Sequence, residues 1–100
     1  MGFFRNRERR EIKRKAIPQA ATNEIGRDCV VRRIYAINNS GGTLTVQAND
    51  ADGSPILPVQ TLPNNSRLDF TPEEGETAKG GVVWSASGPG LYGGIVYFDP

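Results

Sequence analysis

The stretch GGVVWSASGPGLYGGIVYFDP, residues 80–100, is the densest apolar segment of the chain and decides how the rest must fold. Two runs of β-branched and aromatic residues, at positions 82–84 and 95–98, flank a turn rich in Gly, Pro and Ser. This pattern is typical of a β-hairpin. We therefore predict a hairpin here that forms the centre of the core, with the other strands packed around it.

Residues 28–38 predict the first strand of the folded body. Strict alternation along a strand divides its apolar residues between two faces. Apolar residues on both faces indicate a central strand, in which Arg32 and Arg33 must emerge at an edge or pair with acids. The two predicted faces are Val31, Tyr35 and Ile37 on one side, and Val30, Ile34 and Ala36 on the other.

Turns rich in Asn, Asp, Ser and Gly separate this strand from the next ones. Residues 38–42 and 50–54 have the residue types that tolerate the positive φ angles of tight hairpins. Between them, residues 43–49 alternate polar and apolar side chains, which predicts a half-buried strand. Its inward-facing residues are expected to be Leu44, Val46 and Ala48.

Three prolines in residues 54–63 confine that segment to a sheet edge or to an extended crossing between sheets, because proline lacks a backbone donor. Residues 67–70 predict a short strand with Leu68 and Phe70 facing in, and residues 73–81 an exposed loop. The runs amount to roughly six or seven short strands with turns every eight to twelve residues, the spacing of a sandwich. The predicted fold is an all-β small β-sandwich or jelly roll.

Charge is distributed unevenly between the two ends of the chain. Residues 1–16 carry seven basic and two acidic residues, a net charge of +5, and residues 17–100 carry five basic and nine acidic residues, a net charge of −4. No apolar run approaches the roughly 20 residues of a membrane span. The early charges are not followed by an apolar stretch, so we expect no secretory signal.

The basic segment is predicted to be a separate arm. Residues 1–27 are interpreted as an N-terminal arm and connector, and residues 28–100 as the β-sandwich body. On a helix, Phe4, Glu8 and Ile12 would share one face, so we expect a short helix when the arm is docked and a mobile or extended arm otherwise. The predicted partner-binding residues of the arm are Phe3, Phe4, Arg5, Arg7, Arg9, Arg10, Ile12, Lys13, Arg14 and Lys15.

The residue types argue against an enzyme. The chain has no histidine, which excludes Ser-His and Cys-His dyads and the usual transition-metal ligand sets. Cys29 is the single cysteine and lies in a predicted buried strand, where it should behave as a small apolar residue. Three glutamates crowd residues 73–76, but nothing in the sequence buries them. We predict no catalytic residue and no cofactor.

Two motifs resemble ligand-binding loops only in part. Asp50-Ala51-Asp52-Gly53 is similar to the opening of a calcium loop, but the third acidic position and the distal glutamate are missing, so a hairpin turn is predicted. The glycines of residues 87–94 are followed by a strand, whereas a phosphate-binding loop is followed by a helix. Gly93 and Gly94 instead indicate a bulge or the close approach of a neighbouring backbone.

Three interpretations of the basic arm stay open. It docks on an acidic protein surface, with Phe3 and Phe4 as anchors. It neutralises phosphates of a nucleic acid, on whose bases the same two rings could stack. Or it is a solvated tail without a partner. The acids at positions 8 and 11 and the aromatic start favour a protein partner of defined shape.

Several segments taken together resemble small virion proteins of tailed bacteriophages: VRRIYAINNSGGTLTVQAND, then RLDF, then VVWSASGPGLYGGIVYF. The resemblance covers about residues 28–100 and rests on generic β residues. It implies a sandwich or jelly-roll body of the capsid decoration (cement) type, or of a fibre or neck component, in a virion assembled in the host cytoplasm. It further implies the major capsid protein or another virion protein as partner, and a homo-oligomer, with a trimer expected.

Overall fold

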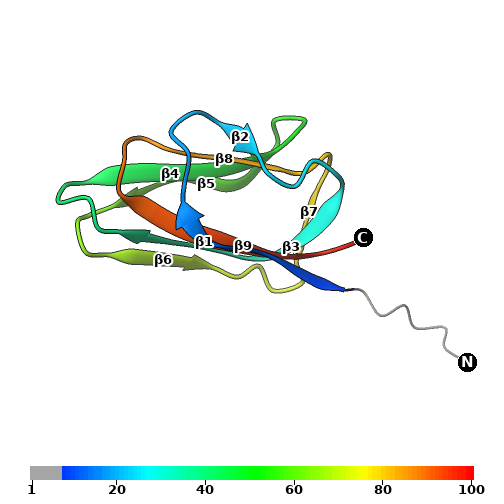
Figure 1. Ribbon diagram of the computed structural model, residues 1–100. Coiled ribbons are helices and arrows are strands. Elements are labelled where there is room, and N and C mark those ends of the chain that lie inside the picture. The colour runs from blue at the N-terminus through cyan, green and yellow to red at the C-terminus, as the bar shows by residue number, and fades with distance from the viewer. Residues whose placement is uncertain (1–7) are drawn as a thin grey trace, which may run out of the picture.

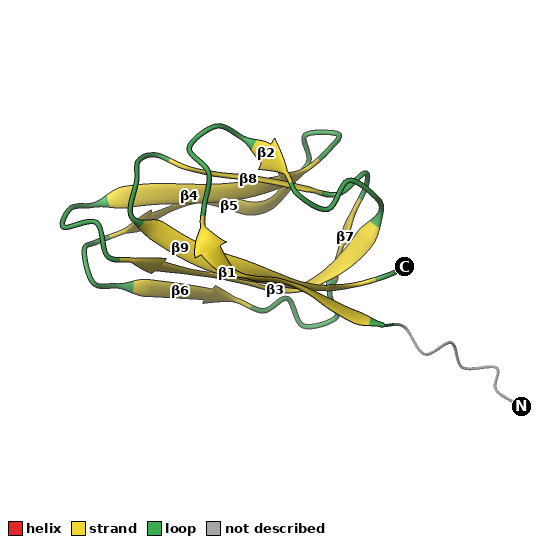
Figure 2. Ribbon diagram, in the orientation of Figure 1, coloured by secondary structure: helices red, strands yellow, loops and turns green. Residues whose placement is uncertain are grey.

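The computed structural model describes residues 8–100 and builds them entirely from β-strands, turns and loops (Figures 1 and 2). The predicted all-β class is confirmed. No helix in this part of the chain is long and apolar enough to cross a membrane. The strands are β1 (Arg9–Ala16), β2 (Thr22–Asn23), β3 (Cys29–Asn38), β4 (Leu44–Asp50), β5 (Pro55–Leu62), β6 (Arg67–Phe70), β7 (Glu76–Ala78), β8 (Val82–Ala86) and β9 (Leu91–Phe98).

The strands form two antiparallel sheets that lie face to face (Figure 1). Sheet A has the order β1-β9-β3-β6, with β7 also paired to β3, and sheet B has the order β2-β8-β4-β5. The buried apolar side chains of both sheets form one core, which includes Trp84, Ile34 and Ile95, none of them exposed. The structure is therefore a β-sandwich, as predicted.

The pairing of the strands is nested from the ends of the chain inward. β1 pairs with β9, β2 with β8, β3 with both β6 and β7, and β4 with β5. Because β6 and β7 lie one after the other along β3, they act as one interrupted strand. Eight strands paired first with last in this way, in two sheets, form a jelly roll.

The segment of residues 80–100 is central but is not a hairpin. β8 lies in sheet B between β2 and β4, whereas β9 lies in sheet A between β1 and β3. Residues 87–90 therefore cross from one sheet to the other, and the predicted hairpin is wrong. Residues 39–43 make a similar crossing between β3 and β4. Gly and Asn show where a chain reverses direction, but they do not show whether it returns in the same sheet.

A bulge in β3 corrects the predicted faces of that strand. The pairing of β3 with β9 shifts between Val31 and Arg33, which inserts one extra residue into the strand. As a result Val31 and Ile34, predicted on opposite faces, both point into the core. Val30, Tyr35 and Ile37 lie half-buried on the outer face of sheet A.

The predicted boundary between arm and body is also corrected. Residues 9–16 form β1 of sheet A instead of a helix or a detached arm, and β2 joins sheet B. Ile12 packs against the core, and Ile17 is buried in it. The physical reason is that β9, an apolar interior strand, needs a partner for the backbone groups of its second edge.

The strands predicted within residues 43–49, 54–63 and 67–70 are confirmed, whereas the exposed loop predicted for residues 73–81 contains β7, whose Ala78 is buried. β4 presents Val46 and Ala48 to the core, and β5, which contains two of the three prolines, is an edge of sheet B. The turn between them is a true hairpin, in which the amide of Asp50 donates to the carbonyl of Ser54 over 2.9 Å. In β6, Leu68 and Phe70 pack against the core.

Candidate interaction surface

β1 carries six of the ten predicted binding residues, and it lies at an edge of sheet A with β9 as its pairing partner (Figure 1). The register is continuous from Arg9 opposite Phe98 to Ile12 opposite Ile95. A bulge follows, after which Lys15 lies opposite Gly93. Six of the eight residues of β1 are exposed and the other two are half-buried, so the strand is a surface element.

The structure divides the predicted binding residues into several groups. Phe3, Phe4, Arg5 and Arg7 lie outside the described residues. Ile12 points to the core side of sheet A, which removes it as an anchor for a partner. The cationic residues of β1 differ in how far other side chains already neutralise them.

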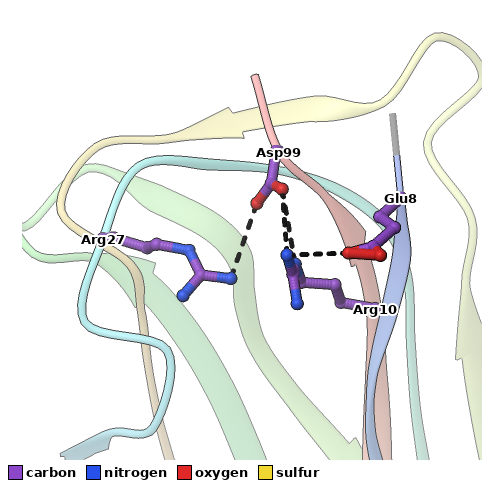
Figure 3. Close-up of polar contacts among 4 residues, drawn as sticks. All are labelled: Glu8, Arg10, Arg27 and Asp99. Carbon is purple, nitrogen blue, oxygen red and sulfur yellow. Dashed lines mark hydrogen bonds and ion pairs between the residues drawn. The ribbon is translucent and has the colours of Figure 1, made fainter. Parts of the chain in front are cut away.

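Arg10 is engaged within the molecule, near the C-terminus (Figure 3). Its guanidinium pairs with the carboxylate of Asp99 at 3.3 Å and with that of Glu8 at 2.9 Å. Arg27 reaches the other oxygen of Asp99 at 3.5 Å. The hydrogen bond from Arg10 to Asp99 and the charge of that carboxylate raise the pKa of Arg10. This cluster ties β1 to the last residues of the chain.

Lys15 is engaged at the other end of β1. Its ammonium donates to Oε1 of Glu24, whose Oε2 accepts a 2.6 Å hydrogen bond from the indole Nε1 of Trp84. Trp84 is fully buried in the core, and Glu24 is only 15% exposed. Glu24 thus links the basic strand to the centre of the sandwich. A buried tryptophan needs an acceptor for its N–H, but the sequence did not indicate which side chain provides it.

Arg9, Lys13 and Arg14 are the cations of β1 that face solvent. Arg9 makes an exposed 3.3 Å pair with Glu11, and Lys13 and Arg14 make no ion pair with any residue of the described range 8–100. Arg14 also lines an open hollow of about 370 Å³, together with Ile37, Asn39 and Tyr92. Positive charge is therefore available for a partner at the bulge of β1.

A second charged group joins β3 and β6 of sheet A. Arg33 donates two 2.8 Å hydrogen bonds to Asp69, and its guanidinium lies 4.6 Å from the ring centroid of Tyr35. The hydrogen bonds lower the pKa of Asp69 and raise that of Arg33. The prediction that an arginine of β3 pairs with an acid is confirmed for Arg33.

The two glycines of β9 make close contacts, as predicted. A Cβ atom on Gly93 would lie 2.0 Å from the carbonyl oxygen of Tyr35. A Cβ atom on Gly94 would lie 2.5 Å from the carbonyl oxygen of Ile12 and 2.8 Å from the hydroxyl of Tyr35. A side chain at either position would therefore separate β9 from its neighbours.

The other candidate groups from the sequence are buried in the core, bonded within a turn or exposed to solvent. Cys29 is fully buried, and desolvation raises the pKa of its thiol to about 11, so the thiol stays protonated at neutral pH. Oδ1 of Asp50 accepts the amides of Asp52 and Ser54 within the hairpin turn. Glu73, Glu74 and Glu76 are exposed. Within residues 8–100, no group of three or more His, Cys, Asp or Glu side chains could hold a metal ion.

Comparison with known proteins does not add a relative from which a role could be transferred. No family model, curated protein or solved structure matches the chain. The candidate site is therefore defined by its own chemistry: a cationic edge strand, with Arg9, Lys13 and Arg14 facing solvent, on a jelly-roll body.

Proposed function

We propose that this protein is a non-enzymatic structural component of a bacteriophage virion, which binds and stabilises the capsid shell as a decoration protein. The observation that carries the proposal is the jelly-roll topology, in which the nested pairing places the basic β1 at an open edge. Jelly rolls recur in viral capsid proteins, although the same fold also serves lectins and cupins. The resemblance of residues 28–100 to small phage virion proteins supports the same choice.

The charge layout supports attachment through β1. Arg9, Lys13 and Arg14 form a cationic edge next to a body whose residues 17–100 carry a net charge of −4. An acidic surface of the major capsid protein would be attracted to that edge. The same asymmetry suits a homo-oligomer such as a trimer, in which the basic edge of one copy meets the acidic body of the next.

The direct test follows the protein through a density gradient of phage particles released from the cells that encode it. The decoration proposal expects the protein to co-migrate with assembled capsids. Reversing two charges, with Lys13→Glu and Arg14→Glu, should release it from them. The matched control reverses the exposed cations Arg32 and Lys79, which lie away from β1, and should stay bound. A protein found only in the soluble fraction would contradict the proposal.

Immunogold labelling of the same particles would distinguish the shell from the neck, the portal region or a fibre, which are the alternative positions in a virion. Label over the whole shell supports decoration. Label confined to one vertex or to the tail supports a neck, portal-proximal or fibre component.

A nucleic-acid-binding module is the second candidate. One observation favours it: the solvent-facing cations of β1 follow two further arginines, Arg5 and Arg7, in the sequence. Phosphate contacts would give affinity for DNA that falls steeply with salt. The test is anisotropy of a labelled single-stranded oligonucleotide, titrated with the protein from about 20 to 200 mM salt. Absence of binding at the lowest salt concentration would eliminate this candidate.

A further inference from the structure

We propose that the free edge of β1 is a docking site for an acidic, extended segment of a partner protein, which adds to sheet A as a further strand. The inference specifies how the proposed virion protein would grip its partner, and in that respect it rests on the proposed function. Its support is the backbone of β1 together with the charges that surround it.

The other sheet edges in the described part of the chain are poor templates for an added strand. β2 has two residues, and β6 and β7 have four and three with a loop between them. β5 has eight residues, but Pro55 and Pro58 interrupt its row of donors. β1 has eight residues and no proline. It is thus the longest of these edge strands in which every residue has a backbone N–H, although the bulge after Ile12 divides the row.

The backbone direction of β1 can be derived from its contact with β9. The carbonyl of Ile12 is directed at Gly94, since a Cβ atom there would lie 2.5 Å from that oxygen. Successive residues of a strand direct their N–H and C=O groups to opposite edges. The backbone N–H and C=O groups of Arg9 and Glu11 therefore face away from β9, toward the free edge. The bulge after Ile12 ends the regular ladder, so the site accommodates a segment of about four or five residues.

The charges of β1 select the chemistry of the incoming strand. The strand has five cations and one acid, and among residues 8–100 Lys13 and Arg14 make no ion pair. A second copy of β1 would place like charges opposite one another, which destabilises strand pairs. Lysines on an edge strand oppose such self-association. An acidic segment would meet opposite charges along the same edge, so the site selects against pairing with a second β1 and for an acidic partner.

The test compares two substitutions at one outward-facing residue. Glu11→Pro removes an N–H donor from the free edge, at a place where proline is tolerated in edge strands, and Glu11→Thr removes the same charge but keeps the donor. The probe is a fluorescein-labelled peptide, Thr-Glu-Val-Glu-Thr-Glu-Val, and its control has Lys in place of each Glu. Anisotropy should show that the threonine variant binds the acidic peptide at least as tightly as the natural protein. The proline variant should bind about tenfold more weakly.

A second measurement, hydrogen exchange of the backbone amides of the natural protein, tests the added strand directly. Bound acidic peptide should slow hydrogen exchange at the amides of Arg9 and Glu11, and the exchange of β5 amides should not change. This readout does not depend on whether the proline variant folds. Unchanged exchange at Arg9 and Glu11 under saturating peptide would overturn the proposal.

Three further outcomes would also overturn it. Equal affinity of the proline and threonine variants would mean that side-chain charge alone holds the peptide. Equal binding of the lysine peptide would remove the charge selection. An oligonucleotide that binds more tightly than the acidic peptide, with no difference between the two variants, would identify the edge as a nucleic-acid contact. Co-migration with capsids in the absence of peptide binding would refute only this docking mode and leave the decoration role in place.

Discussion

β1 and β9 are neighbouring strands of eight residues each, paired antiparallel with one bulge in β1, yet they are opposite in character. Six residues of β9 are buried and none is charged, whereas β1 has no fully buried residue and five cations. The difference arises from position, because β9 has a partner on each side and the core beneath it, while β1 has a partner on one side alone. A segment that is basic in composition can thus be integral to a sheet.

Removing β1 should have the largest effect of the changes considered. Deletion of residues 1–16 exposes an edge of β9 and removes several ladder hydrogen bonds together with the packing of Ile12, a loss on the order of 5 kcal/mol in the free energy of unfolding. Deletion of residues 1–8 leaves β1 intact and should cost less than about 1 kcal/mol. Urea unfolding followed by far-UV circular dichroism measures both. Similar stabilities for the two truncated proteins would contradict the assignment of β1 to the sandwich.

Ile12 of β1 and Ile95 of β9 lie opposite each other, so substituting each in turn compares the burial of the two strands directly. Ile95 is fully buried and Ile12 half-buried, at matched positions of the ladder. Ile95→Ala should destabilise the protein by about 3–4 kcal/mol and Ile12→Ala by about 1 kcal/mol. Thermal unfolding by calorimetry gives both values. Equal losses would mean that β1 packs as deeply as β9.

Glu24 provides a smaller effect, because its substitution affects one buried donor. Glu24→Ala leaves the indole N–H of Trp84 without its acceptor, at a cost of about 2 kcal/mol. Glu24→Gln keeps one acceptor for the indole N–H and turns its amide NH2 toward the ammonium of Lys15. Because the Lys15 side chain is half exposed and can turn into solvent, the cost should be under about 1 kcal/mol. Trp84 is the single tryptophan, and its fluorescence reports unfolding of both variants. Equal destabilisation by alanine and glutamine would show that the charge, and not the hydrogen bond, matters.

The pair of Arg33 and Asp69 should have the smallest effect, since both side chains are exposed. The hydrogen bonds from Arg33 lower the pKa of Asp69, so the pair stabilises the fold above the unfolded carboxyl pKa of about 4. That contribution is lost as the pH falls through the lower folded pKa. Asp69→Asn should therefore cost under about 1 kcal/mol at pH 7, and this cost should shrink as the pH falls through the folded pKa of Asp69. If the difference in free energy of unfolding between the variant and the natural protein grew as the pH fell, the predicted direction of the pH dependence would be wrong.

Local pattern predicted much of the fold. The alternation of residues 43–49, the prolines of β5 and the hairpin at Asp50 are properties of neighbouring residues, so the sequence is sufficient to predict them. The pairing of β8 with β9 was predicted wrongly, because turn residues are the same for a return within a sheet and a crossing between sheets. The bulge at Val31 was missed for a related reason, since strict alternation has no means of showing an inserted residue.

The candidate site was predicted in part. The cations of β1 were identified from charge alone, but their division into engaged and available groups depends on acids distant in sequence: Asp99 for Arg10, and Glu24 for Lys15. The helical stripe through Ile12 was a poor guide, because a thin apolar stripe also fits one face of a strand. Here the free edge of β9 determined that the segment forms a strand and not a helix.

The sequence by itself determined the all-β class, the place of residues 80–100 at the centre of the core and the concentration of positive charge near the N-terminus. Tertiary structure alone decided that β1 closes sheet A, that β8 and β9 lie in different layers, and which cations face solvent. The physical reason is that strand propensity and charge are local properties. Strand pairing and ion pairing join residues far apart in the chain, and the shared core selects among the possible partners.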